Sequence, residues 1–449
     1  MSRVVGSSLT QGSIAAPVLK LSATFALGSF LNMIGFVVDR KLVGLAGTHA
    51  LAALGSAHAA LMIIVTFALG LSIGALSGVA RHMGAGEPGQ AARFAINGVY
   101  VGLAFGLAML GLSFIAPAPV LAFMGADPDV SGPAADYLAV TMAGMVFHAP
   151  LLMLAFSLQG AGLARLALLL SAIPALLNAA LDWPFIFTFG LGVAGAAWAG
   201  VVAHVVGLVL ALVLLFRSPL KPEPGGLRFD AARVKRIVQI GVPGSLEHMV
   251  RTVAGFALVA LITRFGAEVV SGYTSGQVIL MLLVTPGVAI GQATATLVGQ
   301  NLGARAPRRA WDTVKIATGL YVGLVAVAGL LVYLGADHLI GSFDPHPEVM
   351  AQGALMLRTG VLCFPFLAVA MVVSRAFAGA GRTVPMMVVA AIAHLGVQIP
   401  TVVLLSRALG PIGAYIGMSV AFTVHGALSG AMFLRRFGAW RRNEIAPTT

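Results

Sequence analysis

Hydrophobic residues are gathered into about twelve long runs that are apolar on every side. The runs lie near residues 16–45, 50–80, 94–117, 133–160, 166–189, 191–216, 232–264, 269–302, 312–334, 348–380, 384–407 and 411–435. About 20 apolar residues are enough for a helix to cross the hydrocarbon core of a bilayer. The runs do not alternate apolar and polar residues, as the strands of a membrane β-barrel would. The pattern predicts an all-α polytopic membrane protein with twelve transmembrane helices.

The composition also indicates that lipid is the main solvent of this chain. Of its 449 residues 59% are hydrophobic and 9% are charged, and the mean hydropathy is +0.97. An ordinary soluble domain carries about 25% charged residues. The single cysteine, Cys363, excludes an intramolecular disulfide and any site built from paired thiolates. The first fifteen residues lack the apolar core and cleavage pattern of a signal peptide, so we expect none to be removed.

The net charge of +12 reflects topology. Basic residues gather near the two termini and in alternate loops, whereas acidic residues occupy the opposite loops. The basic positions include Arg3, Lys20, Arg81, Arg93, Arg165, Arg217 through Arg236, Arg305, Arg308, Arg309, Lys315, Arg375, Arg382, Arg435, Arg436, Arg441 and Arg442. The acidic positions are Asp127, Asp129, Asp136, Glu268, Asp337, Asp344 and Glu348. This is the positive-inside pattern, which predicts cytoplasmic N- and C-termini and argues against nucleic-acid binding.

The chain divides into two halves that resemble each other. The longest polar stretch, 217–233, separates six spans from six, and it predicts an N-lobe at 1–216, a cytoplasmic linker at 217–231 and a C-lobe at 232–449. The similar segments are GLSIGALSGVARHMGAGEPGQAA (70–92) with GVAIGQATATLVGQNLGARAPRRA (287–310), LQGAGLAR (158–165) with FAGAGRTV (377–384), and NAALDWPF (178–185) with HLGVQIPT (394–401). Because six added spans preserve helix orientation, these are parallel repeats, which are typical of transporters.

Two carboxylates lie within the apolar runs of the N-lobe. With a helix rise of 1.5 Å per residue, Asp182 in LLNAALDWPFIF lies about 25 Å from the cytoplasmic edge and Asp39 about 28 Å. Asn178 lies one helical turn before Asp182. Two carboxylates that share a dry cavity disfavour joint ionisation, so the pair could hold a proton and release it when the cavity rearranges. The structural alternatives are an Asp182 hydrogen-bonded to Trp183 Nε1–H or to a neighbouring hydroxyl, and an Asp39 solvated within a charge cluster at the outer end of its span.

Other polar residues within the spans favour structural roles. Glu247 and Arg251 are four residues apart, the spacing of an ion pair along a helix. Histidines also occur within the spans, at His58, His148, His204, His248, His394 and His425. We expect each of these to be a packed, hydrogen-bonded residue. The sequence contains no metal-ligand spacing and no nucleophile motif, so we expect neither an enzyme nor a metal site.

The segments VVDRKLVGLAGTHALAALG (37–55) and TLVGQNLGA (296–304), with the Gly-rich turn at 78–86, resemble the multidrug and toxic compound extrusion (MATE) family over nearly the whole chain. The resemblance implies two six-helix lobes in a V and drug efflux coupled to inward H⁺ or Na⁺. Within the family, the chain resembles the DinF-like branch, whose N-lobe holds the coupling carboxylates. Asp39, Asn178 and Asp182 match its coupling residues. Tyr137 matches a tyrosine that borders the same pocket, and Gly200 stands where a threonine often completes the network.

The C-lobe departs from the NorM-like branch of the family. Eight residues after Pro243, where that branch has a glutamate, this chain has Arg251, and the aspartate expected near Leu367 is absent. We therefore do not expect C-lobe Na⁺ coupling. Arg40 and Lys41 are a second departure, because a basic side chain turned inward would pair with Asp39.

The resemblance and the buried acids together give a first hypothesis. It is a monomeric antiporter of the bacterial inner membrane that expels drug-like or amphipathic metabolites, organic cations first among them, in exchange for protons. The coupling ion would be H⁺, and Na⁺ is the alternative coupling ion. No cofactor is expected. A second hypothesis is a flippase or exporter of a lipid-linked or anionic precursor, which requires a basic cavity. The only basic residues assigned to the spans here are Arg251 and Arg40. A membrane-embedded enzyme is the third hypothesis.

Overall fold

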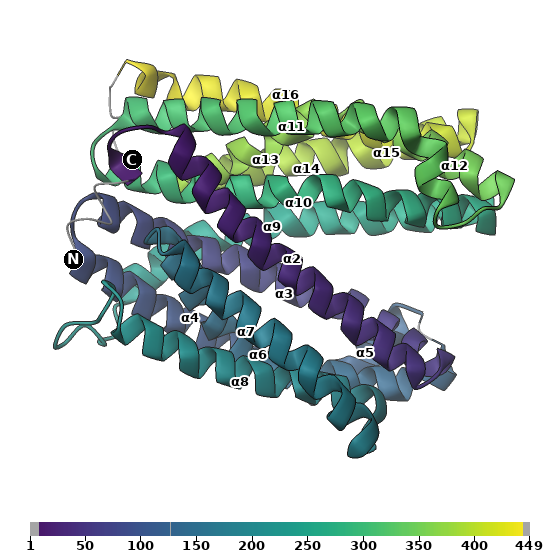
Figure 1. Cartoon of the computed structure of the whole chain (residues 1–449), viewed down its shortest axis with the longest axis horizontal. Helices are drawn as coiled ribbons and strands as arrows, with labels where there is room; N and C mark the ends of the chain where they lie inside the picture. The colour runs from purple at the N-terminus through teal and green to yellow at the C-terminus, as the bar shows by residue number, and fades with distance from the viewer. Residues whose placement is uncertain (1–8, 126, 443–449) are drawn as a thin grey trace. The chain divides into compact units, whose positions relative to one another are not determined.

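The computed structural model describes residues 9–125 and 127–442, and the regular secondary structure in these ranges is helical (Figure 1). The helices that are long and apolar enough to span a membrane are α2 (Ala15–Leu45), α3 (Thr48–Gly84), α4 (Pro88–Ser113), α6 (Pro128–Gly160), α7 with η1 (Ala164–Trp183 and Pro184–Thr188), α8 (Gly192–Phe216), α9 with η2 (Ala231–Ile262 and Thr263–Phe265), α10 (Ala267–Gly303), α11 (Pro307–Gly341), α14 with η3 and α15 (Val384–Ala391, Ile392–Gln398 and Ile399–Leu409) and α16 (Pro411–Arg441). Arg3 and the outermost residues of both predicted lobes lie outside the described ranges.

The remaining span is bent. Helices α12 (Pro347–Val361) and α13 (Phe364–Gly379) meet at an angle of 56°. Counted as one, this pair brings the number of candidate spans in the described residues to 12, which confirms the predicted fold class. A further short helix, α5 (Pro117–Phe123), lies between α4 and α6.

The helices form two compact units. The described part of the N-unit is 23–245, and that of the C-unit is 9–22 with 246–442. The limits differ from the predicted lobes because the first half of α9 packs against α3. There Gly70 and Gly74 let the α9 backbone come close, and the Ser245 hydroxyl donates a hydrogen bond of 2.7 Å to the Phe67 carbonyl. Helices α2 and α9 therefore each contribute to both units.

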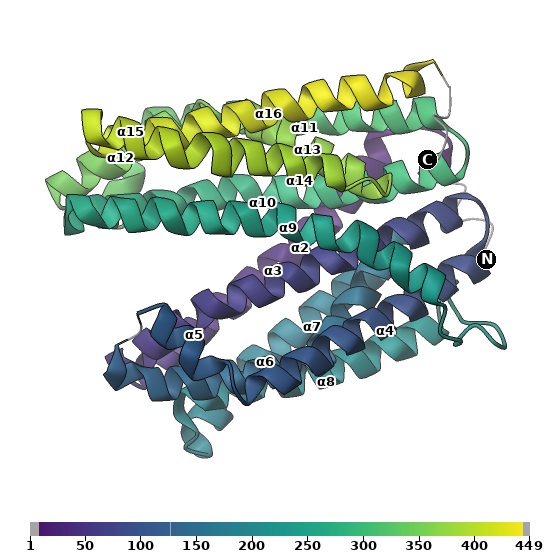
Figure 2. The ribbon, with the colours of Figure 1, turned by 180° about the vertical axis from the view of Figure 1, so that it is seen from behind.

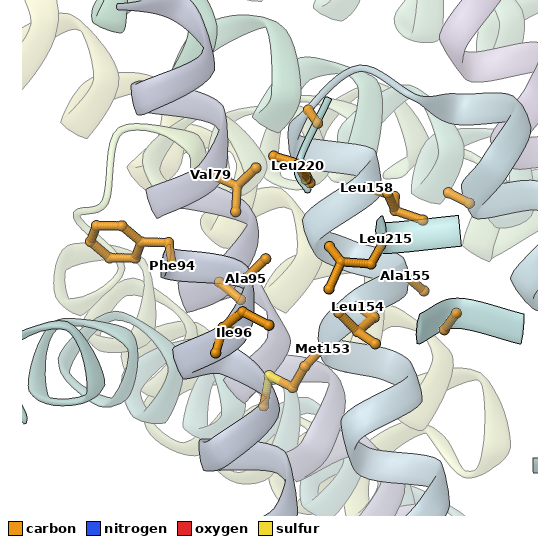
Figure 3. Packing of buried hydrophobic residues seen from close by; sticks show 14 of the residues in the cluster. Val79, Phe94, Ala95, Ile96, Met153, Leu154, Ala155, Leu158, Leu215 and Leu220 are labelled. Carbon is orange, nitrogen blue, oxygen red and sulfur yellow. The ribbon is translucent and has the colours of Figure 1, made fainter. Parts of the chain in front are cut away.

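The N-unit core is a layer of interlocking side chains where α3, α4, α6 and α8 meet (Figure 3). Val79 and Ile96 lie in the same cluster as Leu154 and Leu158, whereas the Phe94 ring points away from these leucines and packs against Gly78 of α3. Leu215 and Leu220 pack into the same cluster from the end of α8 and the segment after it. Helices in lipid associate through van der Waals packing of this kind, because the bilayer supplies no hydrophobic drive between them.

The same backbone geometry occurs in both units. A Cβ atom at Gly160 would lie 2.6 Å from the Leu76 carbonyl oxygen, and one at Gly379 would overlap the Ala295 carbonyl. Both residues of the second pair stand 219 residues after those of the first. The turn after α3 places Gly86 at φ 77°, and 219 residues later Arg305 is at φ 57°, in the left-handed region that favours glycine. The internal repeat is thus present in the three-dimensional structure of each unit.

The segment 217–230 lies at the same end of the N-unit as the α3–α4 turn, with α5 at the other end (Figures 1 and 2). Its attachment to α4 is specific. The Tyr100 hydroxyl donates to the Leu227 carbonyl, and the Asp230 amide donates to Asn97 Oδ1 over 2.8 Å. These contacts fix the predicted linker to the N-unit.

Candidate functional site

The N-unit holds a buried pair of carboxylates contributed by α2 and α7. Asp182 is 0% exposed and Asp39 is 9% exposed. Helix α2 packs against α7 at Gly35, where a Cβ atom would be in ordinary contact, 3.5 Å from the Ala175 carbonyl oxygen. The two carboxylates interact electrostatically with each other and with the buried Tyr137 of α6. The structure therefore brings together three of the predicted site residues.

These carboxylates lack the hydrogen bonds that buried acids usually have. Within the described residues, both oxygens of Asp182 and Oδ1 of Asp39 have no hydrogen-bond partner. A buried acceptor without a donor costs about 1–3 kcal/mol, and more when it is charged. The Trp183 side chain, proposed as a structural partner, is 54% exposed and makes no such bond. The structural alternative for Asp182 is therefore not what the structure shows.

Asn178 and Gly200 lie side by side at the edge of this cluster. Asn178 is half-buried on α7, and a Cβ atom at Gly200 of α8 would be 3.2 Å from its Oδ1. A residue with a hydroxyl at position 200 would thus lie next to the Asn178 amide. The glycine leaves that position without a side chain.

The basic residues after Asp39 form no ion pair with it among the described residues, although Arg40 interacts with it electrostatically. Arg40 and Lys41 are exposed, and the Arg40 guanidinium lies over the Phe36 ring, 5.6 Å from its centroid. Helix α2 continues to Leu45, so Asp39 lies inside the helix. The alternative of a solvated charge cluster at the end of the span does not describe Asp39.

Both units contain a π-helical segment next to these positions. Segment η1 begins two residues after Asp182, and η3 contains His394 and Gln398, the counterparts of Asn178 and Asp182. His394 and Gln398 are hydrogen-bonded to each other, with Nδ1 and Oε1 2.6 Å apart. Single π-helical turns are frequent at functional sites. The C-unit copy has His394 and Gln398 at these two positions, whereas the N-unit copy has Asn178 and the acid Asp182.

The C-unit encloses a cavity of about 500 Å³ between α9, α10, α13, η3 and α16. Its polar wall is built from α9 and α13. The Arg251 guanidinium lies 2.6 Å from Nδ1 of His248, and the Arg375 guanidinium lies 2.9 Å from its Nε2. Glu247, 4% exposed, accepts a hydrogen bond of 2.6 Å from the Ser374 hydroxyl.

Two sequence predictions for this region need correction. Glu247 and Arg251 do not form the expected ion pair among the described residues, because Ser374 binds the carboxylate and His248 draws the guanidinium one turn back. Arg375 was assigned to a cytoplasmic loop, but it lies within α13 and lines the cavity. Its position inside the apolar run MVVSRAFAGAG was the signal that it lies within a span.

Of the remaining span histidines, four are packed in pairs, and His58 packs against the Phe36 ring with the ring centroids 4.9 Å apart. His148 and His204 stack with their ring centroids 3.9 Å apart, and His394 Nε2 lies 3.1 Å from His425 Nδ1. Across 9–125 and 127–442, no three His, Cys, Asp or Glu side chains are arranged to hold a metal ion.

Comparisons with known proteins identify the family. The chain is 24% identical over 439 residues to a probable multidrug resistance protein NorM of Thermotoga maritima, covering 96% of this chain and 94% of that protein. It is 25% identical over 449 residues to the probable multidrug resistance protein YpnP of Bacillus subtilis, covering 97% and 98%. The fold matches a crystal structure described as MATE in the bent conformation, with a TM-score of 0.91, 24% identity and coverage of 97% and 98%.

The family model described as MatE matches residues 25–184 and 243–404, which is more than half of the chain. The protein therefore belongs to the MatE family, the multidrug and toxic compound extrusion transporters, and it is a multi-pass membrane transporter of small molecules rather than an enzyme.

Proposed function

We propose that the chain is a secondary antiporter that exports amphipathic small molecules in exchange for protons carried by Asp39 and Asp182. The observation that carries the proposal is the burial of both carboxylates, three of whose four oxygens have no hydrogen-bond partner among the described residues. A charged carboxylate in such a place is unfavourable, and two together are worse, so the cluster favours taking up a proton. Access to water on the other side of the membrane would release it.

Tyr137 and Asn178 would tune this cycle without carrying the proton. Tyr137 is buried and interacts electrostatically with both acids. Asn178 lies one turn before Asp182 and could donate a hydrogen bond to a carboxylate after a small rotamer change. The basic loops support cytoplasmic termini and a place in the bacterial inner membrane, and we propose that the chain acts as a monomer.

Transport measurements in proteoliposomes would test the coupling. Protein would be reconstituted with an imposed inward proton gradient, and efflux of a fluorescent organic cation would be followed with and without Na⁺. We expect Asp39→Asn and Asp182→Asn each to abolish gradient-driven efflux, and Na⁺ to be unnecessary. The matched control is Asp136→Asn, an exposed acid on the same helix as Tyr137, which should transport like wild type. Unchanged transport by Asp182→Asn would refute the proposal.

An anionic substrate is the second candidate, and a specific observation favours it. An anionic substrate requires a basic cavity, and the C-unit cavity has two arginines in its lining, Arg251 and Arg375. The efflux assay should therefore be run with an organic anion beside the organic cation. Failure of the wild type to move either under a proton gradient would refute export as proposed.

A further inference from the structure

The C-unit cavity contains two arginines without an acidic partner. Among the described residues, no carboxylate lies within ion-pair distance of Arg251 or Arg375. The one carboxylate in the lining, Glu247, attracts Arg375 but is hydrogen-bonded to Ser374. Two guanidinium groups and one carboxylate leave the cavity wall with one net positive charge.

The imidazole between the arginines cannot satisfy both. Arg251 approaches one ring nitrogen of His248 and Arg375 approaches the other. A neutral imidazole has one lone pair and one N–H, and a guanidinium can only donate. One arginine therefore faces an N–H, and protonation of His248 would leave both without an acceptor. The arrangement lacks an acceptor for at least one guanidinium.

The other polar groups of the cavity already have partners. The Gln277 amide donates to the Tyr273 hydroxyl over 2.6 Å, and His394 is bonded to Gln398. Most of the remaining wall is apolar, with Phe364 and Phe422 among its residues. The cavity thus places one net positive charge, carried by the two guanidinium groups, beside an apolar and aromatic surface.

A ligand that matches this wall has one anionic group and one apolar body. A carboxylate or phosphate supplies several lone pairs and negative charge, and guanidinium groups bind both in charge-assisted pairs. A volume of about 500 Å³ is within the range of cavities that hold drug-sized ligands. Burial of an unpaired charge is costly, so a bound anion would also lower the free-energy cost of the unpaired guanidinium charge.

We propose that the C-unit cavity binds amphipathic organic anions, with a carboxylate or phosphate held between Arg251 and Arg375 and an apolar body against Phe364 and Phe422. As a statement about the exported substrate, this rests on the exporter function proposed above. As a statement about binding, it stands on the cavity alone. The anionic group could belong to a soluble molecule or to a lipid headgroup.

Binding to the wild-type full chain in a non-ionic detergent is the first test. The probes are 1-naphthaleneacetate, its uncharged amide, and 1-naphthylmethylamine, which share one aromatic body and differ in charge. We expect the carboxylate to bind at least about tenfold more tightly than the amide, as a charge-assisted hydrogen bond allows, and the amine to bind weakest. Equal binding of the three probes, or tighter binding of the amine, would overturn the proposal without recourse to any variant.

Variants then locate the site. Arg251→Gln and Arg375→Gln should each remove the preference for the carboxylate, whereas Arg375→Lys should keep part of it. The matched control is Arg358→Gln, which removes a C-unit arginine that pairs with Asp337 outside the cavity and should leave the preference unchanged. A preference that survives in both glutamine variants would place the anion elsewhere and overturn the proposal.

Two further experiments are needed. One distinguishes a lipid headgroup from a soluble anion as the ligand, and the other distinguishes anion binding from the proposed proton coupling. In nanodiscs, competition by phosphatidylglycerol but not phosphatidylcholine, lost in Arg375→Gln, would support the site and assign it to a lipid headgroup. Competition by neither lipid would support it as a site for soluble anions. Anion binding is measured on wild-type protein without a proton gradient, whereas proton coupling is measured as gradient-driven efflux, so failed proton coupling and failed anion binding are distinguishable.

Discussion

Replacing Asp182 by leucine should make the protein more stable while it stops proton-driven transport. Leucine has a similar size and no polar atoms, so it removes two buried oxygens that have no hydrogen-bond partner among the described residues. An unsatisfied buried polar group costs about 1–3 kcal/mol, so we expect the variant to gain roughly that amount of unfolding free energy. For a chain of 449 residues, the scaling of unfolding entropy with length makes each kcal/mol correspond to about 1 °C in Tm.

The assay is thermal unfolding of purified protein in detergent, followed by intrinsic fluorescence and by loss of the monodisperse size-exclusion peak. Asp136→Leu serves as the control, because that carboxylate is exposed and its removal relieves no burial. A variant that is more stable but inactive would indicate that Asp182 is retained for function at the expense of stability. A lower Tm for Asp182→Leu than for wild type would refute the reasoning, because it would mean that the carboxylate has stabilising partners.

Three further changes test other parts of the structure. Gly379→Leu should abolish the monodisperse peak, because its side chain would overlap the backbone of the neighbouring helix, whereas Gly323→Ala, in open space, should be tolerated; a well-folded Gly379→Leu would contradict the close approach. Asn97→Ala should speed tryptic cleavage within 217–230, because it removes the acceptor that fixes this segment, and an unchanged cleavage rate would count against that role. The hydrogen bonds from His346 lower the pKa of Asp344 below its ordinary 3.8, so Asp344→Asn should reduce the Tm slightly at pH 7. This difference should be lost as the pH falls below 3.8 through the folded pKa, and a difference that is constant with pH would show that the carboxylate charge does not contribute.

The spans were predictable because lipid imposes a simple demand on sequence. Each helix needs about 20 apolar residues, and long runs of that kind are visible without a structure. The bend between α12 and α13 was not predicted, because the run 348–380 is continuous in hydropathy. Its cause is local, since Pro365 lies in the first turn of α13 and cannot donate a helical hydrogen bond there.

The acids of the N-unit and the position of Arg251 within a span were predictable, but the position of Arg375 was not. Asp39 and Asp182 lie well inside apolar runs, where a charge is costly and helix rise gives its depth. Arg375 lies near the end of its run, and distance along the sequence could not show that α13 continues past it to Gly379. The spacing of Glu247 and Arg251 allowed an ion pair, but neighbouring helices supplied Ser374 and Arg375, which the sequence could not place beside α9.

The left-handed turn at Arg305 shows that the two halves share a backbone conformation that only one of them fills with glycine. Its counterpart, Gly86, adopts the same conformation without a steric cost. An L-residue with a side chain is disfavoured there by about 1–2 kcal/mol. Arginine occupies the position in the second half, in a loop that carries several other positive charges. The second half therefore keeps the turn at a cost in conformational energy that the first half does not have.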